Sequence, residues 1–223
     1  MELFTLKDIE VEKNGNSLFS FKELNINKGD KVAIIGLSGS GKSTLLRLFN
    51  GMEIPKKGEI LYKKNPIPND KKLSLLRKNV ILIDQSPFIT GPFVKNFFYY
   101  IKNFSVYKNI KINEEEILQM LKMFSLSYIS LDRKVDTLSI SEKQRLALIR
   151  AILLKPEILL LDEPTSSLDK KITEIVIENI LKKNIVETII SVSHNILWIK
   201  NCNKEIELCK KTITIKENYA KYN

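Results

Sequence analysis

The chain has 223 residues, 43% of them hydrophobic and 28% charged, a length and composition that fit one α/β domain with a sizeable core. Its formal net charge is +10, but the lysines occur as scattered pairs. This favours a solvated surface over nucleic-acid binding, with mild attraction to an anionic membrane as the alternative. No apolar stretch is long enough to span a bilayer, and the acidic N-terminus is unlike a signal peptide, so we expect a cytosolic chain.

The first predicted element is an antiparallel hairpin over residues 2–27, where two runs alternate apolar and polar residues. The apolar run KVAII predicts a buried strand at 31–35. Residues 36–44 read GLSGSGKST, which fits the pattern G-x-x-x-x-G-K-[ST], and residues 44–50 have the apolar stripe of a helix. A strand, a glycine-rich loop and a helix in this order predict a phosphate-binding loop, because backbone N–H groups and a helix N-terminus attract an anion.

The side chains of this loop have separate expected tasks. Lys42 would bridge the β- and γ-phosphates of a nucleotide, and the Ser43 hydroxyl would bind Mg²⁺. The loop as a whole would surround the phosphates with Gly36, Leu37, Ser38, Gly39, Ser40, Gly41, Lys42, Ser43 and Thr44.

The middle of the chain changes pattern twice. Residues 56–65 predict a turn and a short strand, and NVILID at 79–84 predicts a buried strand that ends before Gln85. The strand pattern then disappears from 86 to 137, where helical patterns occur around 113–125. We interpret this region as a small helical subdomain inserted in the α/β core.

An aromatic-rich stretch, Phe93 to Tyr100, lies within that region. Two interpretations are open: it forms a groove that grips a partner's helix, or it packs inside the subdomain.

Residues 138–169 form the most informative block of the sequence. Within it, the apolar run 158–161 predicts a buried strand that carries Asp162 and Glu163 to its C-terminal end, where ligands bind in parallel sheets. Two neighbouring carboxylates there can divide the work of holding a metal and handling a water molecule. At the start of the block, Ser139 and Glu142 form a capping box that predicts a helix.

The C-terminal part returns to alternating elements. It predicts a helix at about 170–183, a strand at 187–193 ending before His194, and one or two short strands between 203 and 216. Helices that alternate with buried strands predict a mostly parallel sheet.

The two cysteines, Cys202 and Cys209, have no histidine or second cysteine pair nearby that would make a metal site. We expect both to be reduced thiols, as in a cytosolic protein.

Together, these motifs resemble the ATP-binding subunit of ABC transporters over nearly the whole chain. The loop at 36–43 is similar to Walker A, LSISEKQR at 138–145 to the signature LSGGQxQR, ILLLDE at 158–163 to Walker B, and SSLD at 166–169 to the D-loop. The resemblance implies a single ABC-type ATP-binding domain over 1–223. Its fold would be a P-loop NTPase core with a mostly parallel sheet, a flanking antiparallel β-hairpin, and a small helical subdomain at about 86–150.

The resemblance also implies cofactors and residue roles. ATP and Mg²⁺ would bind, with the metal held by Asp162, Ser43 and Gln85. Glu163 would polarise the attacking water, and His194 would contact the γ-phosphate and position that water. Gln85 would in addition signal the nucleotide state to a membrane partner.

Two further site residues are implied on the side that faces a second subunit. Ser139, in the signature, would contact ATP held by the opposite subunit, and Asp169 would act across the dimer interface. The expected partners are therefore a second ATP-binding subunit and a membrane permease, with no nucleic acid, and the chain would sit peripherally on the inner face of the membrane.

The sequence departs from the family pattern twice. The aromatic residue that stacks on adenine in the family falls at or near Val11, so we expect modest nucleotide affinity and little preference for ATP over GTP. The two signature glycines are Ile140 and Ser141, which we expect to impair contact with the opposite nucleotide.

Several interpretations stay open at this point. In a homodimer both composite sites would be slow, whereas in a heterodimer this chain's own site would pair with a partner's intact signature. A soluble ABC-type ATPase and a weakly hydrolysing regulatory binder are the other two hypotheses. The transported substrate and the direction of transport are properties of the permease.

Overall fold

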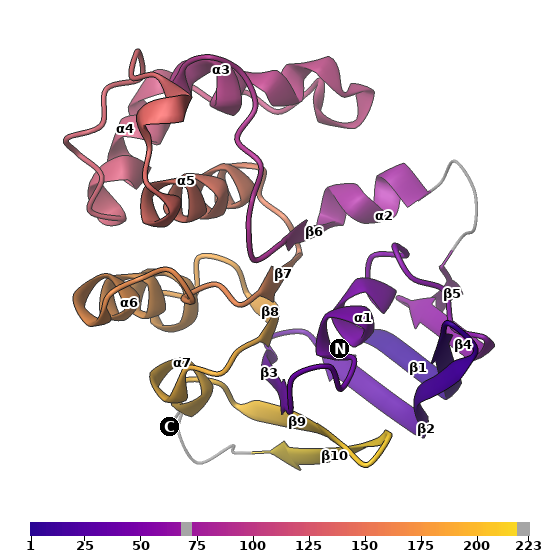
Figure 1. Ribbon diagram of the computed structural model, residues 1–223. Helices are drawn as coiled ribbons and strands as arrows, with labels where there is room; N and C mark the ends of the chain where they lie inside the picture. Colours follow the sequence, from indigo (N-terminus) through magenta and orange to yellow (C-terminus); the bar gives the residue numbers. More distant parts are fainter. Residues whose placement is uncertain (68–72, 218–223) are drawn as a thin grey trace.

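The computed structural model describes residues 1–67 and 73–217 and shows two β-sheets with helices packed around them (Figure 1). The first is an antiparallel sheet in the order β2-β1-β4-β5. β1 (Glu2–Lys13) and β2 (Asn16–Asn27) form the predicted hairpin, which is thereby confirmed. β4 (Lys57–Tyr62) pairs with the other edge of β1, and β5 (Asn65–Pro66) pairs with β4. The hairpin is thus half of a larger sheet.

The second sheet is the mostly parallel one that the alternating elements predict. Its strand order is β10-β9-β3-β8-β7-β6, and only β10 runs antiparallel to its neighbour. The strands are β3 (Lys31–Gly36), β6 (Val80–Ile83), β7 (Ile158–Asp162), β8 (Thr188–Val192), β9 (Lys204–Cys209) and β10 (Thr212–Glu217).

The strand β7 is apolar from Ile158 to Leu161 because both of its faces are buried there. Leu159 and Leu161 point into a core shared with the helices, whereas Ile158 and Leu160 point into a second core shared with the antiparallel sheet. The period of two along a strand sends successive side chains to opposite faces. The run of four apolar residues that predicted this strand therefore contributes side chains to both cores.

Different elements cover the two faces of this central sheet (Figure 1). On one face lie α5 (Ile140–Leu153), α6 (Lys170–Ile177), a π-helical continuation over Glu178–Lys182, and α7 (Ile196–Lys200). On the other face, α1 (Lys42–Leu48) packs between the two sheets. α1 begins two residues earlier than the predicted helix at 44–50.

The region after β6 is helical, as predicted. It contains α3 (Val94–Tyr99) and α4 (Glu114–Met123), joined by short 3₁₀ turns, and leads into α5. Phe97 and Phe98 are fully buried in the core between these helices. The packing interpretation therefore holds for these two members of the aromatic stretch.

Two helices lie where the sequence analysis predicted none. They are α2 (Leu73–Asn79), which leads into β6, and α7, which follows His194. Both are too short for a clear helical periodicity. Within residues 1–67 and 73–217, no helix has the length and apolar character needed to cross a membrane. Cys202 is a buried free cysteine and Cys209 an exposed one.

Candidate functional site

The loop after β3 has a backbone that requires glycine at two places. Gly36 has a φ of 145°, and a Cβ atom there would lie 2.4 Å from the carbonyl oxygen of Leu208 on β9. Gly41 has a φ of 100°, and its Cβ atom would lie 2.8 Å from Cδ2 of Leu18 on β2. Side chains at either position would push the loop away from the strands that support it.

Lys42 is the first residue of α1, and its ammonium group turns back into the loop. Its Nζ donates to the carbonyl oxygens of Gly36, at 3.0 Å, and Leu37, at 2.8 Å. Both acceptors are neutral, so the charged oxygens of a phosphate would be stronger partners for the same ammonium. The Leu37 side chain itself is 81% exposed and points away from the core.

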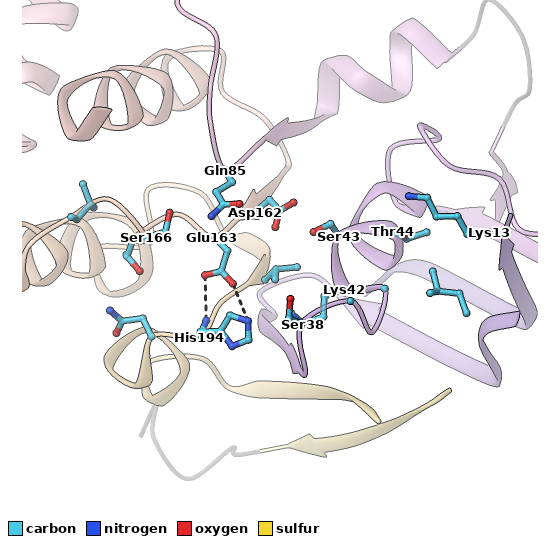
Figure 2. A pocket seen from close by; sticks show the side chains of 17 residues that line it. Lys13, Ser38, Lys42, Ser43, Thr44, Gln85, Asp162, Glu163, Ser166 and His194 are labelled. Atoms are coloured by element: carbon cyan, nitrogen blue, oxygen red, sulfur yellow. Dashed lines mark hydrogen bonds and ion pairs between the residues drawn. The ribbon is translucent and has the colours of Figure 1, made fainter. Parts of the chain in front are cut away.

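Asp162 and Glu163 lie at the C-terminal end of β7, as predicted. Glu163 has a φ of 50°, an unusual backbone conformation for a residue with a side chain. Its backbone N–H donates to the carbonyl of Val192 on β8 at 3.0 Å. Figure 2 shows the Asp162 and Glu163 side chains leaving the end of β7 in different directions, with the Glu163 carboxylate turned toward His194.

The Glu163 carboxylate faces His194, as the dashed lines in Figure 2 show. One carboxylate oxygen accepts from the backbone N–H of His194 at 3.3 Å, and the other lies 3.5 Å from its Nε2. Burial raises the pKa of Glu163 above the ordinary glutamate value, while the hydrogen bond from His194 partly opposes that shift. A buried carboxylate with a raised pKa beside a histidine is suited to accepting a proton from water.

These groups border one cavity of about 810 Å³ between the loop after β3 and the ends of β7 and β8. The structure brings together there most of the side chains that the sequence analysis selected: Ser38, Gly39, Gly41, Lys42, Ser43, Thr44, Gln85, Asp162, Glu163 and His194. The remaining loop residues, Gly36, Leu37 and Ser40, support the loop without lining the cavity.

Ser139 and Asp169 are not among the residues that line this cavity. Ser139 caps the N-terminus of α5, where its Oγ accepts from the backbone N–H of Glu142 at 3.2 Å. Asp169 caps α6, with its Oδ1 accepting from the backbone N–H of Ile172 at 2.9 Å. Within this chain both residues have a helix-capping role, and the capping box predicted at Ser139 is confirmed.

The cavity offers a donor set that fits Mg²⁺. The Ser43 hydroxyl, the Asp162 carboxylate and the Gln85 side-chain amide all border it. Magnesium prefers oxygen ligands, and it commonly combines one or two protein carboxylates with phosphate oxygens and water. No group of three His, Cys, Asp or Glu that could hold a metal occurs in the described part of the chain.

The residues at the hairpin end of the cavity were not predicted from the sequence. Lys13 and Leu18 line it there, whereas Val11 is buried in the core and does not. Val11 therefore points to the inner face of the antiparallel sheet and not into the cavity. Phe19, an aromatic alternative nearby, is also fully buried. Further lining residues that were not selected are Thr165, Ser166, Leu168, Val192 and Asn195.

A second cavity, of about 530 Å³, opens beside the segment that follows Gln85. It is lined by Pro87, Phe88, Ile89, Gly91, Pro92, Phe93, Lys134, Val135, Asp136 and Lys143. Phe88, one of these lining residues, is 82% exposed. An exposed aromatic residue next to a hollow is typical of a protein-binding surface.

Comparison with known proteins gives a family. The family model described as ABC transporter matches residues 21–166. The chain is 32% identical over 199 residues to the spermidine/putrescine import ATP-binding protein PotA of Mycoplasma mycoides, a match that covers 86% of this chain and 54% of PotA. It is 30% identical over 226 residues to the lipoprotein-releasing system ATP-binding protein LolD of Oleidesulfovibrio alaskensis, covering 92% of this chain and 93% of LolD. The chain thus spans about half the length of its PotA relatives.

Solved structures share the fold. A bacterial Atm1-family ABC exporter with ATP bound superposes with a TM-score of 0.84 at 22% identity, over 98% of this chain and 39% of the exporter chain. CbiO1 from Clostridium perfringens, part of the ABC transporter complex CbiONQ, gives a TM-score of 0.79 at 25% identity, over 97% of this chain and 88% of that one. The predicted fold class, with its mostly parallel sheet and separate antiparallel sheet, is confirmed.

Proposed function

The chain belongs to the ABC transporter family, and on that premise we propose that it binds and hydrolyses ATP as the energy-coupling subunit of a transporter. It works as a dimer of ATP-binding subunits beside a separate membrane permease, peripherally on the inner face of the membrane. The observation that supports this proposal most directly is the single cavity that combines the Lys42 loop, the Asp162–Glu163 pair and His194.

The chemistry follows from the residues that surround this cavity. Lys42 and the loop backbone bind the phosphates, and Glu163 accepts a proton from the attacking water, which His194 orients. Ser43, Gln85 and Asp162 would hold Mg²⁺, which would supply charge neutralisation at the phosphates. Catalysis of this kind depends mainly on positioning and on charge stabilisation.

The permease is proposed to dock at the second cavity, around Phe88. The supporting observation is its place: it starts two residues after Gln85, which itself borders the nucleotide cavity. A movement of Gln85 would therefore be transmitted to the docking surface by the short segment that joins the two cavities. If the chain is instead a soluble ATPase, the tagged protein will purify from its native cells without a multi-span membrane protein.

Replacement of Glu163 by glutamine tests the catalytic proposal. The amide cannot accept the proton, so we expect ATP turnover by the purified protein to fall about a hundredfold or more. Nucleotide binding should persist, because the Lys42 loop is unchanged. Glu178→Gln, at an exposed residue of the π-helical segment after α6 that pairs with Lys182, is the matched control and should keep wild-type turnover. Full activity of Glu163→Gln would refute the role given to this carboxylate.

A further inference from the structure

Gln144 on α5 is a buried side chain that uses both ends of its amide. It is 1% exposed. Its Nε2 donates to the backbone carbonyl of Glu163 at 2.9 Å, and its Oε1 accepts from the hydroxyl of Ser167. One amide group thus bridges both ends of the turn that follows the Glu163 carboxylate.

The carbonyl that Gln144 binds belongs to a backbone in an unusual conformation. Glu163 has a φ of 50°, and residues in this region persist only when their surroundings hold them. Two backbone bonds hold this one, from the Glu163 N–H to the Val192 carbonyl and from the Ser166 N–H to the Glu163 carbonyl at 3.2 Å, and the His194 N–H holds the Glu163 side-chain carboxylate. Gln144 adds a side-chain hydrogen bond from α5 to this peptide.

The same helix carries a second anchored group near its start. Glu142 accepts from the backbone N–H of Ser139 at 2.7 Å, from the Tyr128 hydroxyl at 3.0 Å and from the Arg133 guanidinium at 3.1 Å. Glu142 and Gln144 lie two residues apart within one continuous helix. A displacement of the α5 N-terminus would therefore move the Gln144 amide with it.

We propose that Gln144 is a positioning residue that fixes the backbone of Glu163 and transmits movements of the α5 N-terminus to the Glu163 carboxylate. This inference rests on the proposed ATPase function. It assigns to the signature segment a role inside its own subunit, in addition to any contact that Ser139 makes with a second one.

Three variants separate the two hydrogen bonds. Gln144→Leu removes both, and Gln144→Glu keeps the shape and the acceptor for Ser167 but, as a carboxylate, cannot donate to the Glu163 carbonyl. Ser167→Ala keeps the hydrogen bond from Gln144 to the Glu163 carbonyl and loses only the hydrogen bond between Ser167 and Gln144. We expect kcat for ATP to fall about tenfold to a hundredfold in the two Gln144 variants, with KM within twofold of wild type. In Ser167→Ala, kcat should fall less than in either Gln144 variant.

A matched control comes from another buried amide. Asn179 is 3% exposed and donates to the backbone carbonyls of Met123 at 2.8 Å and Ile175 at 2.9 Å, away from the cavity. Asn179→Leu therefore removes these two hydrogen bonds and the one that Asn179 Oδ1 accepts from Lys183 Nζ at 3.0 Å, without touching Glu163. It should lower stability while kcat stays at the wild-type level.

A second readout does not depend on turnover. His194 is the one histidine of the chain, so its ring signals in a ¹H–¹³C NMR spectrum need no assignment. Because the ring lies 3.5 Å from the Glu163 carboxylate, displacement of that carboxylate should move these signals. We expect them to move in Gln144→Leu and Gln144→Glu and to stay in place in Asn179→Leu.

The outcomes are distinct. Unmoved His194 signals in folded Gln144→Glu, or equal movement in Asn179→Leu, overturn the positioning role. If Gln144→Leu does not fold, Gln144→Glu decides alone. If the wild-type protein fails to hydrolyse ATP, the proposed function is refuted, whereas the His194 signals still decide whether Gln144 positions Glu163.

Discussion

At the scale of single residues, Lys13 is the cavity-lining side chain that bears most directly on nucleotide preference. It borders the cavity at the hairpin end, together with Leu18, and Figure 2 shows it far from Glu163 and His194. Neither residue has a π-face on which a base could stack. The resemblance implied an aromatic side chain for this task, and the structure has a lysine at the cavity edge.

Replacing Lys13 by tyrosine should therefore tighten ATP binding. Stacking of a base on an aromatic side chain is worth about 1–3 kcal/mol, so we expect the Kd for ATP to fall about tenfold or more. Lys13→Ala is the control and should bind no more tightly than wild type. Both are measured by titration with a fluorescent ATP analogue. A strong preference of the wild-type protein for ATP over GTP would contradict this account.

At the scale of elements, α5 combines an intact cap with an altered first turn. Ser139 and Glu142 cap the helix as the S-x-x-E pattern predicts. Ile140, at the first helical position, is 67% exposed, and Ser141 follows it. The helix is therefore well formed, while the surface it presents at its N-terminus is bulkier than two glycines would be.

Restoring both glycines, in the variant Ile140→Gly/Ser141→Gly, tests whether this surface limits turnover. If two copies of the chain form the composite sites, we expect ATPase activity to rise on the order of tenfold, because backbone N–H groups can then approach the opposite phosphate. Stability should fall by about 1–2 kcal/mol, since glycine disfavours helix.

The matched control is Ile196→Gly. Ile196 is also 67% exposed and also the first residue of a helix, α7. This variant should lose stability without gaining activity. An unchanged rate in the double variant would mean that the altered signature is not what limits turnover in a homodimer, and would favour a heterodimer in which this chain supplies the hydrolysing site.

At the scale of the whole molecule, Lys204 links the two sheets. It lies on β9 of the central sheet and is 3% exposed. Its Nζ contacts Asp30 at 2.9 Å, Glu217 at 3.1 Å and the carbonyl of Asn25 on β2 at 3.2 Å. Burial lowers the pKa of Lys204, but the two carboxylates outweigh it and raise the pKa above the ordinary lysine value.

Lys204→Met should therefore destabilise the fold strongly. Removing one partner leaves Asp30 buried without its counter-charge, which costs about 3–5 kcal/mol in the free energy of unfolding. Lys182→Met, which breaks an exposed pair with Glu178, should cost less than about 1 kcal/mol. Urea denaturation measures both. If the two variants lost the same free energy of unfolding, Lys204 would contribute no more to stability than a surface ion pair does.

The local motifs of this protein could be identified from the sequence alone. The loop at 36–44 requires glycines and a lysine at set spacing, and the apolar run before Asp162 is a strand buried on both faces. Such features depend on residues close together in the chain. For this reason the predicted strands, the capping box at Ser139 and most of the cavity-lining side chains agree with the structure.

Long-range packing decided what the motifs left open. The pairing of β4 with β1, the burial of Val11 and the place of Lys13 at the cavity depend on which faces of distant strands meet. The bond from Gln144 to the Glu163 carbonyl joins residues 19 positions apart. A local pattern encodes which side chains share a face, but only the packed sheets and helices determine which of these faces meet, and so which side chains support the Glu163 carboxylate.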